Sequence, residues 1–384
     1  MPAAGTDVQS HQIVLIIDDD VMITEGLAAG LARAGRTLVT CNDLESAELT
    51  VDWLKPSHVV CDIRLSGRFG YEGLDFIHFV KRQSPDTRTF LITGDGPDAL
   101  QLEASERGAV GFLCKPFEVA ELDALLNLMA PFREGSPDWP AIIHVPTLND
   151  VLASGVLSSV FQPIVGLPGG IPFGYEALTR CRSDSWMRNP ETLFLYAARK
   201  LQIIELELAC IRNSLQAATG LPGWAALFLN IHPAAFDAGA LLQEVIVHEA
   251  EEAGIALNRI ILEITEQAPL SNHSGAMMAI SNMNQAGIRF AFDDVGIAYS
   301  HLPFIDQVRP AFLKISQNFG SGFEADPTKL KIVRNILALA HDFGCEMILE
   351  GIETRESATA ATDLGIKFAQ GYYFARPAPA SLWE

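Results

Sequence analysis

Several features that define large classes of proteins are absent from this 384-residue sequence. No apolar run approaches the roughly 18 residues that a membrane-spanning helix needs, so a membrane protein is not expected. None of the six cysteines forms a Cys-x-x-Cys pair, which favours buried free thiols in a reducing compartment. Positive charge is scarce, because 27 Lys and Arg stand against 47 Asp and Glu and leave a net charge of −20. A chain this acidic repels polyanions, which argues against DNA and membrane-surface binding.

Common catalytic and targeting motifs are absent as well. His248-Glu249 lacks the second histidine of a His-Glu-x-x-His zinc site, and no P-loop pattern occurs. The first residues have neither the basic start nor the apolar core of a signal peptide. These absences argue against a zinc protease and a nucleoside triphosphatase, and they predict a cytoplasmic protein.

Short apolar runs alternate with helical patterns in the first third of the chain. The runs span 13–17, 58–61, 89–92 and 110–114, and the helical patterns span 22–34, 72–82, 98–107 and 118–130. This alternation predicts a parallel sheet covered by helices on both faces, a doubly wound α/β domain. The runs end in polar residues, namely Asp18, Asp19, Asp62, Thr93 and Lys115. Such strand ends meet at the edge of the sheet where ligands bind.

The residues at these strand ends suit phosphoryl chemistry. Carboxylates placed together suit Mg²⁺, which would neutralise an incoming phosphoryl group. Asp62 would then attack phosphorus as a nucleophile, while Lys115 adds positive charge and Thr93 offers a hydroxyl donor. The alternative is that the acids are only caps and turn formers, although five groups in this order argue against it.

Residues 13–130 resemble the receiver domain of response regulators. The resemblance implies phosphorylation by a sensor histidine kinase and one bound Mg²⁺. The family's roles fall on Asp62 as phosphoacceptor and on Asp18, Asp19, Thr93, Phe112 and Lys115 as metal and switch residues. The loop after the phosphoacceptor departs from the family, because Ser66 stands where proline is usual and residues 68–71 lengthen the loop.

A change of composition at 131–146, where prolines and a glycine punctuate a polar stretch, predicts a linker. We therefore predict a receiver domain at 11–130, the linker at 131–146 and a second domain at 147–384. Eight strand candidates follow the linker, at 159–165, 173–178, 226–231, 259–264, 289–293, 311–315, 346–350 and 367–374. Helical stretches at 191–218, 239–253, 274–286 and 328–343 separate most of them. Eight strands in this length predict a (β/α)8 barrel, with an open doubly wound sheet as the alternative.

The carboxyl ends of these strands carry many oxygen donors. The candidate metal ligands are Glu176, Asn230, Glu263, Asp293 and Asp294. Hard oxygen donors suit Mg²⁺ or Mn²⁺, and two such ions can activate a water and stabilise the leaving oxygen of a phosphodiester. Glu350 is a candidate to deprotonate the water, Lys314 to stabilise developing charge and Arg180 to bind a phosphate oxygen. Taken singly, Asn230 is better explained as a cap, Glu266 and Glu353 as exposed charges, and Lys314 as an ion-pair partner. Asp293-Asp294 is harder to dismiss, because burying two adjacent acids without a cation is costly.

The second domain resembles the EAL phosphodiesterase family, whose signature is Glu176-Ala177-Leu178 here. Further matches lie at 161–165, 230–233, 263–266, 293–296, 350–354 and 370–377. The resemblance implies hydrolysis of cyclic di-GMP to linear pGpG, with the five oxygen donors above holding two Mg²⁺ or Mn²⁺ ions. It assigns catalysis to Lys314, Glu350 and Gln370, substrate binding to Arg180 and Gln162, and support of the loop after the fifth strand to Glu266 and Glu353.

That loop departs from the family, whose usual sequence is Asp-Asp-Phe-Gly-Thr-Gly. Ile297 lacks the threonine hydroxyl, Ala298 lacks the freedom of glycine to adopt positive φ, and Ser316 replaces an aspartate. The leading hypothesis is a phosphodiesterase controlled by Asp62, in a homodimer or tetramer. The alternative is a catalytically weak cyclic di-GMP binder or protein-interaction adaptor. A transcription regulator is disfavoured, because no basic helix-turn-helix follows the receiver.

Overall fold

The computed structural model describes residues 10–65, 71–94, 98–128, 133–134, 140–153, 155–265, 273–296 and 304–383. Contacts divide the chain into two compact units. The first contains residues 1–156 and 181–201, and the second contains residues 157–180 and 202–384. Within the described residues, no helix is both long and apolar enough to cross a membrane.

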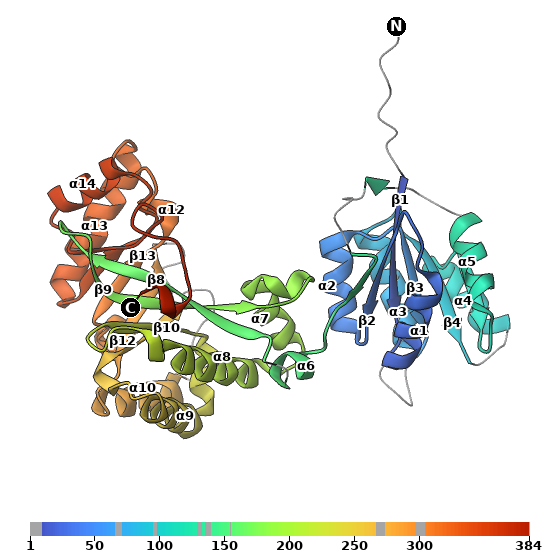
Figure 1. Cartoon of the computed structure of the whole chain (residues 1–384), viewed down its shortest axis with the longest axis horizontal. Coiled ribbons are helices and arrows are strands. Elements are labelled where there is room, and N and C mark those ends of the chain that lie inside the picture. Colours follow the sequence, from blue (N-terminus) through green and yellow to red (C-terminus); the bar gives the residue numbers. More distant parts are fainter. Residues whose placement is uncertain are drawn as a thin grey trace, which may run out of the picture. The chain divides into compact units, whose positions relative to one another are not determined.

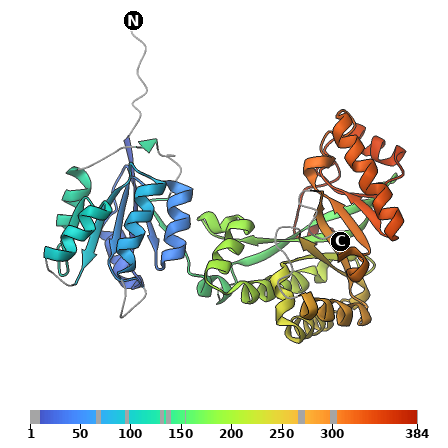
Figure 2. The same cartoon turned by 180° about the vertical axis from the view of Figure 1, so that it is seen from behind.

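A parallel sheet forms the centre of the first unit, in the order β5-β4-β3-β1-β2-β7. Its first five strands are β1 (Ser10–Ile17), β2 (Arg36–Cys41), β3 (His58–Asp62), β4 (Arg88–Thr93) and β5 (Gly111–Cys114). The helices are α1 (Val21–Leu31), α2 (Leu44–Leu54), α3 (Glu72–Gln83), α4 (Asp98–Arg107) and α5 (Val119–Leu128). Figures 1 and 2 show these helices on both faces of the sheet. The predicted doubly wound fold is therefore confirmed.

Three strands of this sheet were not predicted. The pattern of β2 is obscured by Arg36, Thr37 and Thr40, which are polar yet buried. β6 (Arg133–Glu134) pairs antiparallel with β1, and β7 (Ile142–His144) pairs parallel with β2. Both lie in the stretch that its prolines mark as a linker. Strand pairing depends on a distant partner, so composition does not reveal it.

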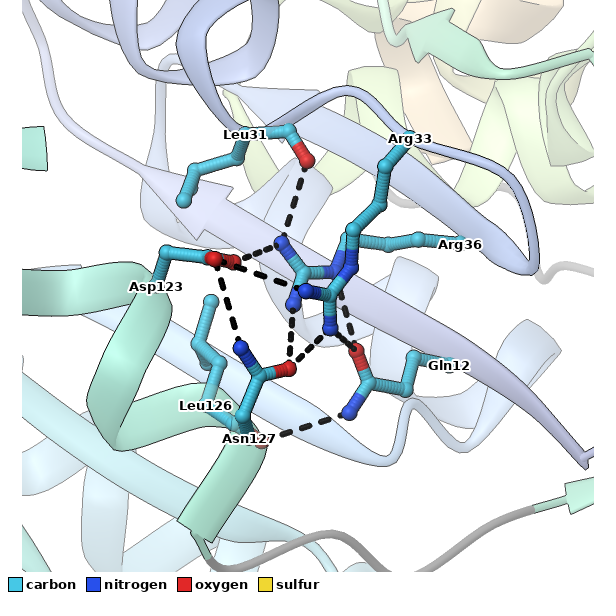
Figure 3. A network of polar contacts seen from close by, with 7 residues as sticks. All are labelled: Gln12, Leu31, Arg33, Arg36, Asp123, Leu126 and Asn127. Atoms are coloured by element: carbon cyan, nitrogen blue, oxygen red, sulfur yellow. Dashed lines mark hydrogen bonds and ion pairs between the residues drawn. The ribbon is translucent and has the colours of Figure 1, made fainter. Parts of the chain in front are cut away.

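A polar network around the buried Arg36 fastens α5 to the sheet (Figure 3). The Arg36 guanidinium donates to Gln12 Oε1 at 2.9 Å, to the Leu31 carbonyl at 3.0 Å and to Asp123 Oδ1 at 2.6 Å. Gln12 in turn donates to the Leu126 carbonyl at 3.2 Å. Burial lowers the pKa of Arg36, while Asp123 opposes that shift. The network thus joins β1, β2 and α5.

We expect Arg36→Met to lower the free energy of unfolding of the chain by about 2–3 kcal/mol. Breaking a buried ion pair costs roughly 3–5 kcal/mol, and the partial exposure of Asp123 reduces that cost. Chemical denaturation of the full chain measures it. Arg33→Met is the matched control, because this arginine is 41% exposed and its loss should cost less than about 1 kcal/mol. Equal costs for the two variants would contradict the role assigned to Arg36.

The second unit is a closed barrel of eight strands, in the order β10-β11-β12-β13-β14-β15-β8-β9. They are β8 (Leu157–Gly166), β9 (Ile171–Cys181), β10 (Ala226–Ile231), β11 (Ile260–Thr265), β12 (Arg289–Val295), β13 (Phe312–Ile315), β14 (Glu346–Leu349) and β15 (Phe368–Ala369). The barrel confirms the predicted fold and excludes the open sheet. β8 departs from a regular (β/α)8 pattern, because it runs antiparallel to β15. The four residues between β8 and β9 are too few for a helical crossover.

Helices cover the outside of the barrel (Figure 1). The longer ones are α8 (Ile203–Ala217), α9 (Ala240–Glu252), α10 (His273–Gln285), α13 (Pro327–Phe343) and α14 (Arg355–Asp363). The shorter ones are α11 (Ile305–Val308), α12 (Gln317–Gly320) and the 3-10 turn η3 (Pro233–Ala238). The helix predicted at 191–218 is two helices, α7 (Pro190–Arg199) and α8. They are separated at Leu201, which has a φ of 56°.

One end of the barrel interior is filled by an apolar layer. It contains Ile164, Phe228, Ile261, Ala291, Phe312 and Ile348, with Phe173 and Phe368 packed against it. Side chains alternate along a strand, so residues two positions apart share a face. On β10, β11, β12, β13, β14 and β15 the next inward layer therefore consists of the residues two positions further along the chain. Those residues are Asn230, Glu263, Asp293, Lys314, Glu350 and Gln370. On the antiparallel β8 the direction reverses, and Gln162 precedes Ile164 by two.

Candidate active site

Lys314 lies at the centre of the polar layer and is fully buried. Its Nζ is 2.8 Å from Glu350 Oε1, 2.9 Å from Glu263 Oε1, 3.3 Å from Glu176 Oε2 and 3.5 Å from Asp293 Oδ1. The four carboxylates come from or directly follow four different strands. One ammonium group therefore lies among four acidic side chains that the closure of the barrel brings together.

The charges of this cluster differ from those of the same groups in water. Burial acts to lower the pKa of Lys314, but the surrounding acids outweigh it and hold that pKa well above its usual value. Burial raises the pKa of Glu350 to about 8 and that of Glu263 well above its usual value. A carboxyl group with a pKa near the working pH is well matched to proton transfer. The raised pKa of Glu350 is compatible with proton transfer, and its role as general base stays a prediction.

Glu176 behaves differently, because three donors stabilise its charged form. Asn230 Nδ2 donates to Glu176 Oε1 at 2.8 Å, and Gln370 Nε2 donates to Oε2 at 2.7 Å. Burial raises the pKa of Glu176, yet Lys314 and these two amides lower it below its usual value. Gln370 Nε2 also contacts Gln162 Oε1 at 3.1 Å. Gln162 therefore orients Gln370 in this structure.

Asp293 and Asp294 lie at an irregularity of β12. The register against β13 shifts between Phe292 and Val295, and Asp294 adopts a φ of 55°. The Asp294 N–H donates to Asp293 Oδ1 at 2.9 Å. In a regular strand two consecutive side chains point to opposite faces, and a bulge interrupts that alternation. The shift removes the constraint that would otherwise keep one of the two acids out of the site.

The donors around Glu263 fit a hard divalent cation. In the part of the chain that the structure describes, Glu263 Oε1 contacts Lys314 Nζ, whereas the buried Oε2 has no hydrogen-bond partner, and such atoms are rarely left unsatisfied. All the neighbouring donors are oxygens, which Mg²⁺ and Mn²⁺ prefer. Among the described residues, no three acids, histidines or cysteines already form a metal cage. We attribute this to Lys314 Nζ, which stands between the carboxylates.

The remaining predicted barrel residues lie apart from the cluster or outside the described chain. Arg180 is half-buried on β9 and donates to the Thr179 carbonyl at 2.8 Å. Glu353 is exposed, and Ser316 is buried immediately before α12. Glu266, Ile297 and Ala298 lie outside the described residues. The substrate-binding and loop-supporting roles of Arg180, Glu353 and Glu266 stay predictions.

The predicted receiver site assembles at the carboxyl end of the first sheet. Lys115 Nζ is 2.8 Å from Asp18 Oδ2 and also forms an ion pair with Asp62. The Lys115 N–H donates to the Thr93 carbonyl at 2.7 Å, which places the end of β4 beside the end of β5. Burial raises the pKa of Asp18. Of the other two predicted residues, Asp19 is exposed and Phe112 is half-buried.

A buried acid close to the barrel site was missed by the sequence analysis. Glu207 on α8 is only 2% exposed and accepts the His232 N–H at 3.1 Å. The available signal was an acid on the apolar face of a helix, between Leu206 and Leu208. That signal is weak, because one such position also fits a helix end or a surface ion pair.

Two family models match the chain, one for each domain. The EAL domain model matches residues 147–377, and the response regulator receiver domain model matches residues 14–127. The chain belongs to the EAL domain family. Its EAL domain therefore contains the barrel site, and its receiver domain contains the site around Asp62.

Known EAL proteins resemble the chain over one or both domains. The cyclic di-GMP phosphodiesterase RocR of Pseudomonas aeruginosa is 26% identical over 336 residues, which cover 83% of this chain and 84% of RocR. The cyclic di-GMP phosphodiesterase NbdA of the same organism is 26% identical and covers 62% of this chain and 31% of NbdA. The chain thus spans most of one relative and about a third of the other.

Solved EAL structures match the barrel. The EAL enzyme Bd1971, in a form bound to cAMP and cyclic di-GMP, is 25% identical with a TM-score of 0.56 and covers 61% of this chain and 65% of its own. The PaMucR phosphodiesterase in complex with c-di-GMP is 24% identical with a TM-score of 0.56 and covers 62% and 98%. The second likeness concerns the fold alone.

Proposed function

We propose that the EAL domain hydrolyses cyclic di-GMP to linear pGpG, and that phosphorylation of Asp62 modulates the rate. The observation that carries the proposal is the buried Lys314 among four carboxylates, one of which, Glu350, has a pKa raised to about 8. The match to RocR, a cyclic di-GMP phosphodiesterase, supports it because that match spans both domains.

The residues at the barrel mouth would have separate roles in metal binding, proton transfer and charge stabilisation. Glu176, Asn230, Glu263, Asp293 and Asp294 would hold two Mg²⁺ or Mn²⁺ ions, and one Mg²⁺ would bind in the receiver. When bound, such cations supply Lewis acidity and lower the pKa of water. The side chains named next would move the proton and balance the charge.

Two side chains would act on the reacting atoms. Glu350 accepts the proton of the attacking water, for which its raised pKa suits it. Lys314 stabilises the negative charge that develops on the phosphoryl oxygens, and its burial strengthens that interaction. Gln370 and Asn230 hold Glu176 in its charged form.

A second candidate function is binding of cyclic di-GMP without turnover. The departures from the usual EAL sequence at Ile297, Ala298 and Ser316 favour it. Incubation of the full chain with cyclic di-GMP and MgCl₂ or MnCl₂ decides between the two. We expect linear pGpG to accumulate. Tight binding with no more product than a Lys314→Ala variant forms would support the second function instead.

A segment of the EAL domain supports the proposed regulation, because it packs within the receiver unit. Residues 181–201 contain η1 (Trp186–Arg188) and α7, and both contact the receiver helix α2. Trp186 Nε1 donates to Thr50 Oγ1 at 2.9 Å, and the Tyr196 hydroxyl donates to Asp43 Oδ2 at 2.6 Å. Both aromatic side chains are buried. The same segment continues directly from β9, which carries Glu176, so the part of the chain that contacts α2 is covalently continuous with a strand of the barrel site.

We expect Tyr196→Phe to weaken the response of hydrolysis to phosphorylation. The variant keeps the ring but loses the hydrogen bond to Asp43 and the weaker one that the hydroxyl accepts from the Leu148 N–H at 3.3 Å, so α2 and α7 are less firmly joined. The measurement is the ratio of rates with and without beryllofluoride, a phosphoryl mimic. That ratio should fall to less than about half of the wild-type effect, since one hydrogen bond to a charged group contributes about 1.5–3 kcal/mol. The basal rate should stay within about twofold.

Two controls accompany this measurement. Leu195→Ala alters an exposed residue of the same helix and should leave the response intact. Asp62→Ala should abolish the response in any background, since it removes the phosphoacceptor. An unchanged response in Tyr196→Phe would exclude this contact from the regulation, and an unresponsive wild-type chain would exclude control by Asp62.

A further inference from the structure

Glu207 is a carboxyl group buried at a position where an apolar side chain would be expected. It is 2% exposed, on the face of α8 that also buries Leu206, Cys210 and Ile211. Burial raises the pKa of Glu207 to about 8, opposed only in part by the hydrogen bond from His232. A carboxyl group in such a position costs free energy that an apolar side chain would avoid. What Glu207 contacts is therefore informative.

The contact of Glu207 is with the segment that leaves β10. Glu207 Oε1 accepts the His232 N–H at 3.1 Å, one residue after the strand ends. The imidazole of His232 accepts the Ala234 N–H through Nδ1 at 3.1 Å and so caps η3. His232 is thus held both through its backbone and through its side chain, which fixes the path of the chain out of β10.

The same segment carries a candidate metal ligand. Asn230 lies two residues before His232, and its Nδ2 donates to Glu176 Oε1 at 2.8 Å. This hydrogen bond to the Glu176 carboxylate therefore depends on where β10 ends. The α8 helix is itself fixed to the barrel, since Asn213 donates to the Leu157 carbonyl at 3.1 Å. Glu207 thus extends from a firmly placed helix to the segment that directs Asn230.

We infer that Glu207 is a positioning residue, which holds the His232 N–H so that Asn230 and Glu176 stand ready to bind a divalent cation. The inference rests on the proposed function. Residues behind metal ligands that orient them typically change metal affinity by about 10–100-fold when they are removed. The hydrogen bond of Glu207 is to the backbone of His232, so its effect would reach the site through the backbone of 230–232.

The test measures metal binding by the full chain without substrate. Mn²⁺ is titrated against Glu207→Leu, which removes the carboxyl oxygen that accepts the His232 N–H, and against Glu207→Gln, which keeps an acceptor at the same reach. We expect the half-saturating Mn²⁺ concentration to rise about 10–100-fold in Glu207→Leu and to stay within about threefold in Glu207→Gln. Thermal unfolding without metal is recorded for each variant.

Two further variants separate positioning from stability. Glu249→Leu removes another buried glutamate, which contacts Gln216 at 3.0 Å on the outside of the barrel. It should lower the metal-free melting temperature and leave Mn²⁺ half-saturation unchanged. Glu207→Asp keeps the carboxyl group but shortens the side chain, so it should raise the half-saturating concentration even if Glu207→Leu does not fold.

Unchanged Mn²⁺ affinity in Glu207→Leu or Glu207→Asp would overturn the inference and leave Glu207 a structural residue. A wild-type chain that binds no Mn²⁺ would overturn it too. A wild-type chain that binds Mn²⁺ with the expected pattern of variants but releases no linear product would refute the proposed hydrolysis and leave the positioning role intact.

Discussion

Replacing Lys314 with methionine should reduce the hydrolysis of cyclic di-GMP by on the order of 1000-fold, because a buried charge aimed at the transition state contributes about 10²–10³ in rate. The side chains are similar in volume, so packing is largely kept. Initial rates of linear product formation, at saturating substrate and metal, measure the effect. Lys367→Met is the matched control, since this lysine is 65% exposed and lies outside the cluster.

The same variant should also lose stability without metal. Lys314 is the cation that lies within 4 Å of Glu176, Glu263, Asp293 and Glu350, and removing one partner of a buried pair costs about 3–5 kcal/mol. Mn²⁺ should therefore raise the melting temperature of Lys314→Met more than that of the wild type. Retained activity would exclude the catalytic role of Lys314. A metal-free melting temperature equal to that of Lys367→Met would exclude its stabilising role.

Glu350→Gln should lower kcat by about 10²–10⁴-fold and leave KM within about threefold. The amide keeps an oxygen that can face Lys314 Nζ, now 2.8 Å from the carboxylate, but it cannot accept a proton from water. The effect should therefore appear in the chemical step rather than in binding. Steady-state kinetics separate the two parameters.

Glu356→Gln provides the comparison for this experiment. The glutamate lies in the first turn of α14 and is exposed, so the same chemical change should alter neither parameter beyond about twofold. If Glu350→Gln instead raised KM with kcat unchanged, Glu350 would contribute to substrate binding and another group would have to accept the proton.

The barrel and its site were largely predictable, for a local reason. Strands of the barrel are recognisable as short apolar runs, and the polar residue that follows each run lies at one mouth. Asn230 follows Phe228 by two positions, and Lys314 follows Phe312 in the same way. A period of two thus places the apolar layer below and the polar layer above without reference to distant residues.

The errors arose where the partner lies far along the chain. β2 contains polar residues that are satisfied only in the folded state, such as Arg36 with Asp123 on α5. The single helix expected at 191–218 divides at Leu201, and its first half packs within the receiver unit. The role of Glu207 can be inferred only from its hydrogen bond with the His232 N–H. None of these contacts leaves a periodic pattern in the sequence.

The sequence by itself determined the two folds, the family and the residue types available for chemistry, because apolar periodicity and strand-end residues are local properties. Only the tertiary structure decided which ionisable groups lie close enough to interact. Closure of the barrel brings four carboxylates to one ammonium, and burial then raises the pKa of Glu350 to about 8. A carboxyl group at the end of an isolated strand would stay in water and keep its ordinary acidity, so the raised pKa of Glu350 is a property of the closed barrel.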